Sequence, residues 1–432
     1  MDGAVAHAGA PAARAQLRVL LSAYACEPHK GSEPGIGWNW ATSLARAGHA
    51  VCVLTRANNR ESIELEMAAN PLPGLRFIYY DLPRWARWWK RGARGVHLYY
   101  LLWQWGAYKV ARRLCRSANF DVAHHITFGV FRHPSFMGFL GLPFVFGPLG
   151  GGEAAPLALR WTYPLRGFLA DLIRDLANWG ARFDPLLNAA YRSSARVLCK
   201  TTETMNCIPR KHRDRCCVGL ELGAEPCLAR PVRRRDDGSF RVLYVGRLVY
   251  LKGLHLGLAA FERLRAAHPG ARFTVIGSGP EEPRLRELAR RSGIDEFVSW
   301  IPWIDRAAVM RAYSEHDAFL FPSLHDSSGN VVLEAMSCAL PVICFDAGGP
   351  SLLVDASCGI RVPARTPEQA VAGLAHALAS LAADPGLAQR MGDAAFRRAC
   401  RDFSWPRQVA RMERLYGDAI AARSARATGV TP

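Results

Sequence analysis

Residues 240–267 read F-R-V-L-Y-V-G-R-L-V-Y-L-K-G-L-H-L-G-L-A-A-F-E-R-L-R-A-A, an apolar run, a glycine-containing turn and an amphipathic run in direct succession. The run Phe240–Val245 predicts a buried strand, and Leu254–Ala267 has the periodicity of a helix that Pro269 and Gly270 end. A strand, a tight turn and a helix form the repeating unit of a parallel sheet covered by helices. This stretch therefore indicates an α/β protein.

The same unit recurs on both sides of this stretch, which predicts two doubly wound, Rossmann-like domains facing a cleft. The expected strands are Leu17–Ala25, Ala50–Thr55, Leu75–Tyr80, Asp121–Ile126, Pro143–Phe146 and Arg196–Lys200, then Phe240–Val245, Phe273–Ile276, Phe297–Trp300, Ala318–Phe321 and Pro341–Phe345. Expected helices include one running through Ala47, Pro283–Arg291 and Val331–Cys338. A chain of 432 residues fits two such domains. We expect a flexible tail at 1–16, domains at 17–229 and 239–406, and a charged linker between them.

Composition excludes a disordered or collagen-like chain, since half of the residues are hydrophobic and 21% are charged. The net charge of +18 suits nucleic acid, anionic lipid or a phosphorylated substrate. Twelve cysteines without a C-x-x-C pair indicate reduced thiols and a cytoplasmic protein. No signal peptide is expected, and the uncharged run at 134–152 contains too many glycines and prolines for a membrane helix.

Residues 322–339, P-S-L-H-D-S-S-G-N-V-V-L-E-A-M-S-C-A, carry the strongest signal of a binding site. A strand ends near Pro322, a loop of small residues follows, and a helix begins near Gly329, where free N–H groups would bind an anion. Glu334 lies one turn into that helix and could accept hydrogen bonds from hydroxyl groups. The alternative is a capped helix whose Glu334 faces solvent.

Two further turns follow strands. In V-G-R-L-V-Y-L-K-G, 245–253, Arg247 and Lys252 could bind a diphosphate, or each could be a surface cation. In G-S-E-P-G-I-G, 31–37, three glycines allow close backbone approach to a ligand, or only a tight turn. The pattern is not G-x-G-x-x-G, and no acidic residue that would bind the ribose hydroxyl groups follows the second strand. Both features argue against a dinucleotide-dependent dehydrogenase.

Together these segments resemble the glycosyltransferase family 4 (group 1) enzymes, which have the GT-B fold of two Rossmann-like domains. The resemblance is specific over 240–360, where V-G-R-L-V-Y-L-K-G, V-I-G-S-G-P and the acidic pair Asp326 and Glu334 occur in the family's order, and looser from Leu17 to about Ala421. It implies an acceptor-side first domain, a nucleotide-sugar-binding second domain and a helix at about 408–421 that crosses back to the first.

The resemblance also assigns roles to residues. Arg247 and Lys252 would hold the diphosphate of the donor, Asp326 would contact the donor sugar, and Glu334 the ribose hydroxyls. The remaining donor-binding positions that it implies are Gly31, Ser32, Gly35, Gly246, Ser327, Gly329, Asn330 and Val331.

Two departures from the family pattern affect the catalytic site. Asp326 stands where most members have Glu, and no histidine occurs near the end of the strand that reads P-F-V-F-G-P-L-G-G-G-E, 143–153. We therefore consider His124, His125 and Glu153 as catalytic replacements, with a structural role for either histidine as the alternative. On an alternating strand only one of the two histidines can face the cleft.

The family resemblance implies retention of anomeric configuration. No two aspartates lie two residues apart, so no D-x-D motif is present to bind a divalent metal, and Arg247, Lys252 and the helix start would replace it electrostatically. We expect no cofactor and no metal, with a UDP- or GDP-linked sugar as substrate.

The segment 84–116 has nine Lys or Arg, no Asp or Glu, and many aromatic residues. This composition suits the interface of an anionic membrane. Alternatively, the aromatic side chains could pack in the first domain. Nucleic-acid binding is the weakest of the three interpretations. The sequence thus predicts a cytoplasmic, peripherally membrane-associated hexosyltransferase acting on a lipid-linked saccharide or polysaccharide precursor. The alternatives are a GT-B enzyme of other chemistry, such as a sugar-nucleotide epimerase or a glycan phosphorylase, and a catalytically silent GT-B subunit.

Overall fold

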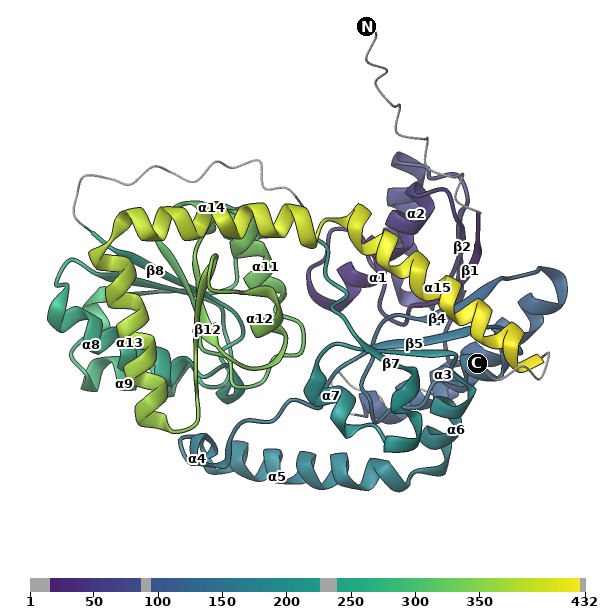
Figure 1. Ribbon diagram of the computed structural model, residues 1–432, viewed down its shortest axis with the longest axis horizontal. Coiled ribbons are helices and arrows are strands. Elements are labelled where there is room, and N and C mark those ends of the chain that lie inside the picture. Colours follow the sequence, from purple (N-terminus) through teal and green to yellow (C-terminus); the bar gives the residue numbers. More distant parts are fainter. Residues whose placement is uncertain (1–15, 87–94, 226–238, 428–432) are drawn as a thin grey trace, which may run out of the picture.

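A computed structural model describes residues 16–86, 95–225 and 239–427 and contains two α/β domains side by side (Figure 1). Each domain has one parallel sheet with helices on both faces, as the alternation of apolar and amphipathic runs predicted. The sheet orders are β3-β2-β1-β4-β5-β6-β7 in the first domain and β10-β9-β8-β11-β12-β13 in the second. The prediction of two Rossmann-like domains is confirmed.

The first domain contains the strands β1 Arg18–Ser22, β2 Ala50–Arg56, β3 Leu75–Tyr80, β4 Val122–His125, β5 Phe144–Leu149, β6 Arg196–Cys199 and β7 Cys216–Val218. Its helices are α1 Ser32–Arg46, α2 Arg60–Ala69, α3 Val96–Ser117, α4 Leu157–Arg160, α5 Leu165–Gly180, α6 Pro185–Ser193 and α7 Thr202–Cys207. The short strand β7 was not predicted, because it has three half-buried residues and lies at the sheet edge.

The second domain contains β8 Arg241–Val245, β9 Arg272–Ile276, β10 Val298–Ile301, β11 Ala318–Phe321, β12 Val342–Phe345 and β13 Gly359–Val362. Its helices are α8 Leu254–Ala267, α9 Glu282–Arg291, α10 Arg306–Ser314, α11 Asn330–Ser337, α12 Gly348–Leu353, α13 Pro367–Ala383 and α14 Pro385–Asp402. The edge strand β13 was also not predicted; it is short and begins with glycine, which weakens any strand pattern.

The order of strands reverses beside β1 and beside β8, so each sheet has a switch point at its centre. β1 pairs with β2 and β4, and β8 pairs with β9 and β11. The loops after β1, β8 and β11 therefore leave the two sheets at carboxyl ends near these switch points. These are the loops that carry the predicted donor-binding residues.

The last helix, α15 Trp405–Ala427, leaves the second domain and packs on the first (Figure 1). Its Trp405 ring meets the Trp40 ring edge to face, and the Trp40 indole N–H donates to the Glu221 carbonyl at 2.8 Å. The Ala224 N–H donates to the Phe403 carbonyl just before the helix. Backbone and side chains thus tie the start of the C-terminal helix to the first domain.

The aromatic segment 84–116 differs from the prediction in part. Residues 87–94 lie outside the described residues, and Tyr99, Tyr100 and Trp103 of α3 are fully buried in the first domain. Edge contacts of Tyr24 with Tyr100 and Trp103 fix them there. The interpretation of these aromatics as membrane contacts is therefore wrong, while Trp105 on the same helix is half exposed.

Over 16–86, 95–225 and 239–427, no single helix has the length and apolarity to cross a bilayer; the two helices α13 and α14 together pass that test but meet at a bend of 105°.

Candidate functional site

A pocket between the domains joins the β1–α1 turn to helix α11. Gly31, Ser32 and Gly35 line it from the first domain, and Asn330 and Glu334 line it from the second. Its wall is completed by Lys30, Ile36, Asn39, 222–225, Arg306, Met310, Leu333, Ser337 and Trp405. Residues that are 300 positions apart in the sequence thus share one cavity at the carboxyl ends of both sheets.

The glycines of this turn differ in whether a side chain would fit at their positions. A Cβ on Gly35 would lie 2.0 Å from the Lys30 carbonyl oxygen, so Gly35 is required by the tight turn itself. A Cβ on Gly31 would meet nothing within 4 Å, because Gly31 borders the open pocket. Ser32, the first residue of α1, has a φ of 57°, a conformation that L-residues adopt at a cost.

Glu334 presents a carboxylate to this pocket from the second turn of α11. Burial raises the pKa of Glu334, with the Arg306 cation and the Tyr313 hydroxyl opposing this effect. The Tyr313 hydroxyl donates to Oε2 at 3.3 Å. The other oxygen has no partner among the described residues, so the carboxylate can accept hydrogen bonds from a ligand's hydroxyl groups.

The loop before α11 is held by Asp326. Its Oδ1 accepts the N–H groups of Ser328 at 3.0 Å and Gly329 at 2.8 Å, and its Oδ2 accepts a charged hydrogen bond from Lys252. Burial acts to raise the pKa of Asp326, but Lys252 and the two N–H groups outweigh burial and lower it below its usual value. Asp326 is thus an ionised carboxylate that shapes the helix start, and Gly329 there has a φ of 81°.

The two predicted cations are placed differently. The Lys252 side chain is 21% exposed and pairs with Asp326. Its Nζ lies 5.1 Å from the centroid of the Phe321 ring. Arg247 is exposed in the turn after β8 and has no ion-pair or hydrogen-bond partner for its guanidinium among the described residues. Gly246 before it has a φ of 159°, and Val331 lies half-buried in the first turn of α11.

Glu153 closes a contact between the domains. Its carboxylate accepts hydrogen bonds from Ser327 at 2.5 Å, Thr201 at 2.6 Å, Thr204 at 2.8 Å and the Gly151 N–H at 3.0 Å. Burial acts to raise its pKa, but these donors lower it. A carboxylate with four donors is poorly suited to abstract a proton, and its geometry makes it a clamp between the glycine loop and Ser327.

The two histidines proposed as catalytic replacements lie in the core, which corrects that expectation. His124 Nδ1 is 2.7 Å from the Tyr416 hydroxyl and its Nε2 is 2.7 Å from the Gly147 carbonyl. His125 bonds Tyr100 and Ser135. Both rings are at most 1% exposed, and burial lowers their pKa to about 4 and about 3. Neither faces the cleft, because both surfaces of this central strand are covered.

A buried ion pair of the first domain, in contact with Ser328 of the second, was not predicted. Lys200, just after β6, pairs with Glu221 at 2.6 Å, and both contact the Ser328 hydroxyl, at 3.1 Å and 2.8 Å. Burial acts to lower the pKa of Lys200, but Glu221 and Glu33 outweigh it and raise it. The position of Lys200 at a strand end was the only sequence signal, and it did not reveal the partner.

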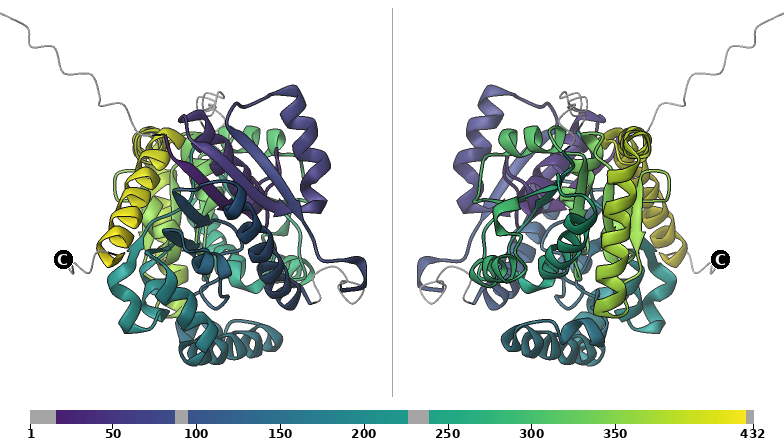
Figure 2. Two further views of the ribbon diagram at one scale, coloured as in Figure 1. Left: turned by 90° about the vertical axis from the view of Figure 1, so that its right-hand side faces the viewer. Right: turned by 90° about the vertical axis from the view of Figure 1, so that its left-hand side faces the viewer.

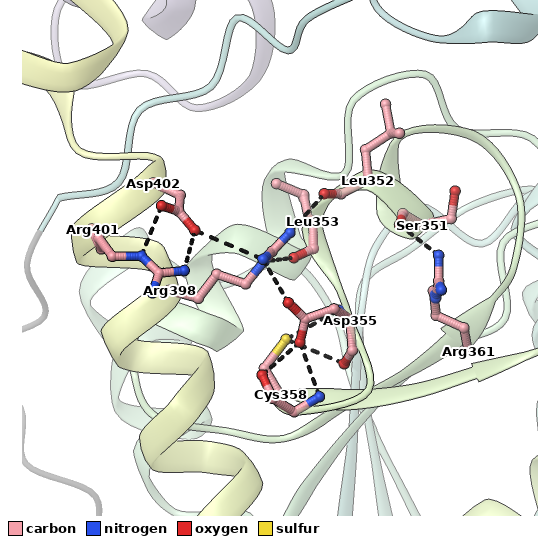
Figure 3. A network of polar contacts seen from close by, with 10 residues as sticks. Ser351, Leu352, Leu353, Asp355, Cys358, Arg361, Arg398, Arg401 and Asp402 are labelled. Carbon is pink, nitrogen blue, oxygen red and sulfur yellow. Dashed lines mark hydrogen bonds and ion pairs between the residues drawn. The ribbon is translucent and has the colours of Figure 1, made fainter.

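Helix α12 supports the loop from behind. The Gly349 N–H donates to the Asp326 carbonyl at 2.9 Å, and a Cβ on Gly348 would lie 2.2 Å from that oxygen. Arg398 of α14 anchors the other end of α12, donating to the Leu353 carbonyl at 2.7 Å and to Asp355 at 2.6 Å (Figure 3). The network of Figure 3 thus fixes α12, and α12 fixes the Asp326 loop.

The described part of the chain has no group of three or more His, Cys, Asp or Glu side chains placed to hold a metal ion. The pocket is lined by Asn330 and Glu334 of α11 and by the cations Lys30 and Arg306, whereas the predicted cations Arg247 and Lys252 are not among its lining residues. Cations and N–H groups bind anions such as phosphates, and a carboxylate binds hydroxyl groups. The arrangement can therefore bind a ligand that carries both.

Comparison with known proteins is consistent with this chemistry. Residues 228–398 match the family described as glycosyl transferases group 1. Over 188 residues the chain is 34% identical to the glycogen synthase of Mycobacterium tuberculosis, a match that covers 43% of this chain and 44% of that relative's length.

Two solved structures cover nearly the whole fold. Sucrose-phosphate synthase from Thermosynechococcus elongatus has a TM-score of 0.64 at 19% identity, covering 94% of this chain and all of that one. HepE from Anabaena, solved in complex with UDP and glucose, has a TM-score of 0.58 at 15% identity, covering 93% of this chain and all of that one. With the two observed parallel sheets, these likenesses confirm the predicted GT-B fold.

Proposed function

We propose that this protein transfers a hexosyl group from a UDP- or GDP-linked sugar to a lipid-linked saccharide or polysaccharide precursor. One observation carries the proposal: Glu334 and the start of α11 share an interdomain pocket with Gly31 and Ser32. The match of residues 228–398 to group 1 glycosyl transferases and the likeness to HepE, a structure with UDP and glucose, support it.

In the proposed complex the nucleoside lies against α11, and the Glu334 carboxylate accepts hydrogen bonds from the ribose hydroxyls. Asn330 and Val331 lie in the first turn of α11, after Gly329, where N–H groups favour a phosphate. Arg247 has no competing partner among the described residues and provides a guanidinium for the diphosphate. Lys252 supplies the second cation while holding Asp326.

The chemistry needs stabilisation of the negative charge that develops on the nucleoside diphosphate as it leaves. At an effective dielectric near 20, a unit charge pair at about 4 Å is worth about 4 kcal/mol. If half of that appears only in the transition state, each cation contributes a rate factor of roughly 30. Arg247, Lys252 and the helix start then take the place of a divalent metal, and the reaction retains anomeric configuration as the family resemblance implies.

The acceptor would enter from the first domain. We place the protein in the cytoplasm at the inner face of the membrane, because a lipid-linked saccharide is presented there. The exposed Trp85 and Trp105 within 84–116, together with the cations of that segment, support contact with such a surface.

The proposal is tested by thermal unfolding with UDP, GDP or ADP, each with and without EDTA. A nucleotide at 100 times its dissociation constant adds about 2.7 kcal/mol to stability. We expect one nucleotide to stabilise the protein, with EDTA making no difference, and Glu334→Ala to lose the effect. Glu287→Ala, which removes an exposed glutamate on α9, is the matched control and should keep it.

Transfer itself is tested by incubating the matching nucleotide sugar with a lipid extract and measuring release of the nucleoside diphosphate. We expect release that depends on the extract and falls at least tenfold in Arg247→Ala. Nucleotide binding without any release would point to a catalytically silent subunit. Conversion of the sugar without release would point to an epimerase.

A further inference from the structure

Helix α5, Leu165–Gly180, turns its apolar side away from the protein. Its outward residues are Leu165, Leu169, Leu172, Ile173, Leu176 and Trp179, exposed by 73, 48, 57, 68, 66 and 58%. Their spacing of three and four residues places them on one stripe of the helix. Figures 1 and 2 show α5 on the outside of the molecule, beneath both domains.

The inward side of α5 is polar, which reverses the usual arrangement of a surface helix. Asp171 is fully buried and accepts a hydrogen bond from the Tyr250 hydroxyl of the second domain at 3.1 Å, beside Arg160 and Arg174. Gly167 lies against the Tyr250 ring, where a Cβ would come within 2.8 Å. A helix normally buries its apolar stripe, so this one is placed to bury the stripe against something outside the part of the chain that the structure describes.

The apolar surface continues past both ends of the helix. Leu157 and Trp161 precede α5 and are 62 and 72% exposed, and Phe183 and Leu186 follow it at 68 and 55%. Aromatic side chains thus flank a central stretch of leucine and isoleucine. This order is typical of segments that lie in the interface of a bilayer, where aromatic rings sit at the level of the headgroups.

The charges around this surface favour an anionic partner. Segment 154–193 has five arginines and three aspartates. All three aspartates are engaged: Asp171 as above, Asp175 with Arg160, and Asp184 in the N-cap of α6. Arg166 and Arg182 are exposed and have no ion-pair partner among the described residues.

We infer that the exposed side of α4, α5 and α6 between residues 157 and 186 is a docking surface for an anionic lipid bilayer. A 16-residue helix is about 24 Å long, so α5 would lie in the plane of the interface with its leucines among the acyl chains and Arg166 and Arg182 at the phosphates. The surface lies outside segment 84–116, and it stands whether or not the proposed transfer reaction does. α3 and α6 both adjoin the short helix η3, Phe136–Leu140, so exposed Trp105 lies on a neighbouring element.

The inference is tested by flotation of the full chain with vesicles of phosphatidylcholine alone and of equal parts phosphatidylcholine and phosphatidylglycerol. We expect binding to the anionic vesicles, reduced at least about tenfold by the triple variant Leu172→Ser, Ile173→Ser, Leu176→Ser. A matched triple variant at exposed apolar positions elsewhere, Leu65→Ser, Trp303→Ser, Phe396→Ser, should bind like the unchanged protein.

Charge is tested separately with Arg166→Glu, Arg182→Glu, against the control pair Arg263→Glu, Arg397→Glu. We expect the first pair to weaken binding to anionic vesicles and the control pair to weaken it much less, because only the first lies at the surface. Nucleotide-dependent stabilisation, measured on the same variants, shows that they are folded and reports on the proposed donor site independently.

Three results would overturn the inference: no flotation of the unchanged protein, flotation of the α5 triple variant equal to that of the unchanged protein, or a control variant that weakens binding as much as the variant it is paired with. Sedimentation equilibrium without vesicles gives a fourth. A dimer that the α5 triple variant abolishes, with no vesicle binding, would make this surface an interface between two copies of the chain.

Discussion

Replacing Lys200 with Met should destabilise the first domain strongly, because it leaves a buried carboxylate without its cation. Glu221 is 1% exposed, its Oε1 lies 2.6 Å from Lys200, and its Oε2 has no hydrogen-bond partner among the described residues. Breaking a buried ion pair by removing one partner costs about 3–5 kcal/mol. For a domain of about 200 residues, that lowers the melting temperature by roughly 6–20 °C.

The double variant Lys200→Met, Glu221→Leu separates the cost of an unpaired charge from the value of the pair. Because well-packed apolar residues can replace a buried pair at little cost, we expect the double variant to unfold within about 1 kcal/mol of the unchanged protein. The coupling energy of this cycle should then be at least about 3 kcal/mol. The double variant also loses both side-chain contacts of the Ser328 hydroxyl, so a bound nucleotide should stabilise it less than it stabilises the unchanged protein.

Urea unfolding followed by tryptophan fluorescence, at neutral pH and constant ionic strength, measures the unchanged protein, Lys200→Met, Glu221→Leu and the double variant. If Lys200→Met alone costs less than about 1 kcal/mol, Glu221 does not carry the cost of an unpaired buried charge, and the account of a dry ion pair is refuted. If the double variant is as unstable as the single ones, the pair itself contributes stability beyond the desolvation of its members, which contradicts the expected neutral replacement.

Three further predictions concern single residues. The pKa of His124 falls from 6.5 to about 4 in the fold, so the unfolded chain binds more protons between these pH values, and the free energy of unfolding should fall by up to about 3 kcal/mol as pH drops from 6.5 to 4. His124→Gln should flatten this pH dependence in urea titrations and leave nucleotide binding unchanged. Loss of nucleotide binding in this variant would return His124 to the site. Arg398→Ala removes bonds to Leu353 and Asp355 and should cost about 1–3 kcal/mol, with faster amide exchange at 348–355; unchanged exchange there would separate α14 from the support of α12. Gly329→Ala places a Cβ at φ 81° and 3.0 Å from Leu353, and should cost about 1–2 kcal/mol and weaken nucleotide binding in calorimetry; tighter binding would contradict a rigid helix start.

The α/β class, the two domains and the loops that carry the candidate site could all be predicted from the amino-acid sequence. These follow from local patterns, since apolar runs alternate with amphipathic ones and glycine turns follow the strands. Leu75–Tyr80 and Ala318–Phe321 match the observed strands, while the edge strands β7 and β13 are too short to give a pattern. The helix start at Gly329 and the positions of Arg247 and Lys252 after β8 are equally local features.

Which side chains meet depends on how distant segments pack in the fold. The contact of Ser328 with Glu221 spans 107 residues and that of Ser327 with Glu153 spans 174, and no local pattern encodes either partner. His124 and His125 carry polar groups that suggested a cleft, but Tyr416 and Tyr100 cover them in the core. The periodicity of α5 gives an apolar stripe without its direction, because the direction depends on the burial of Asp171 against Tyr250.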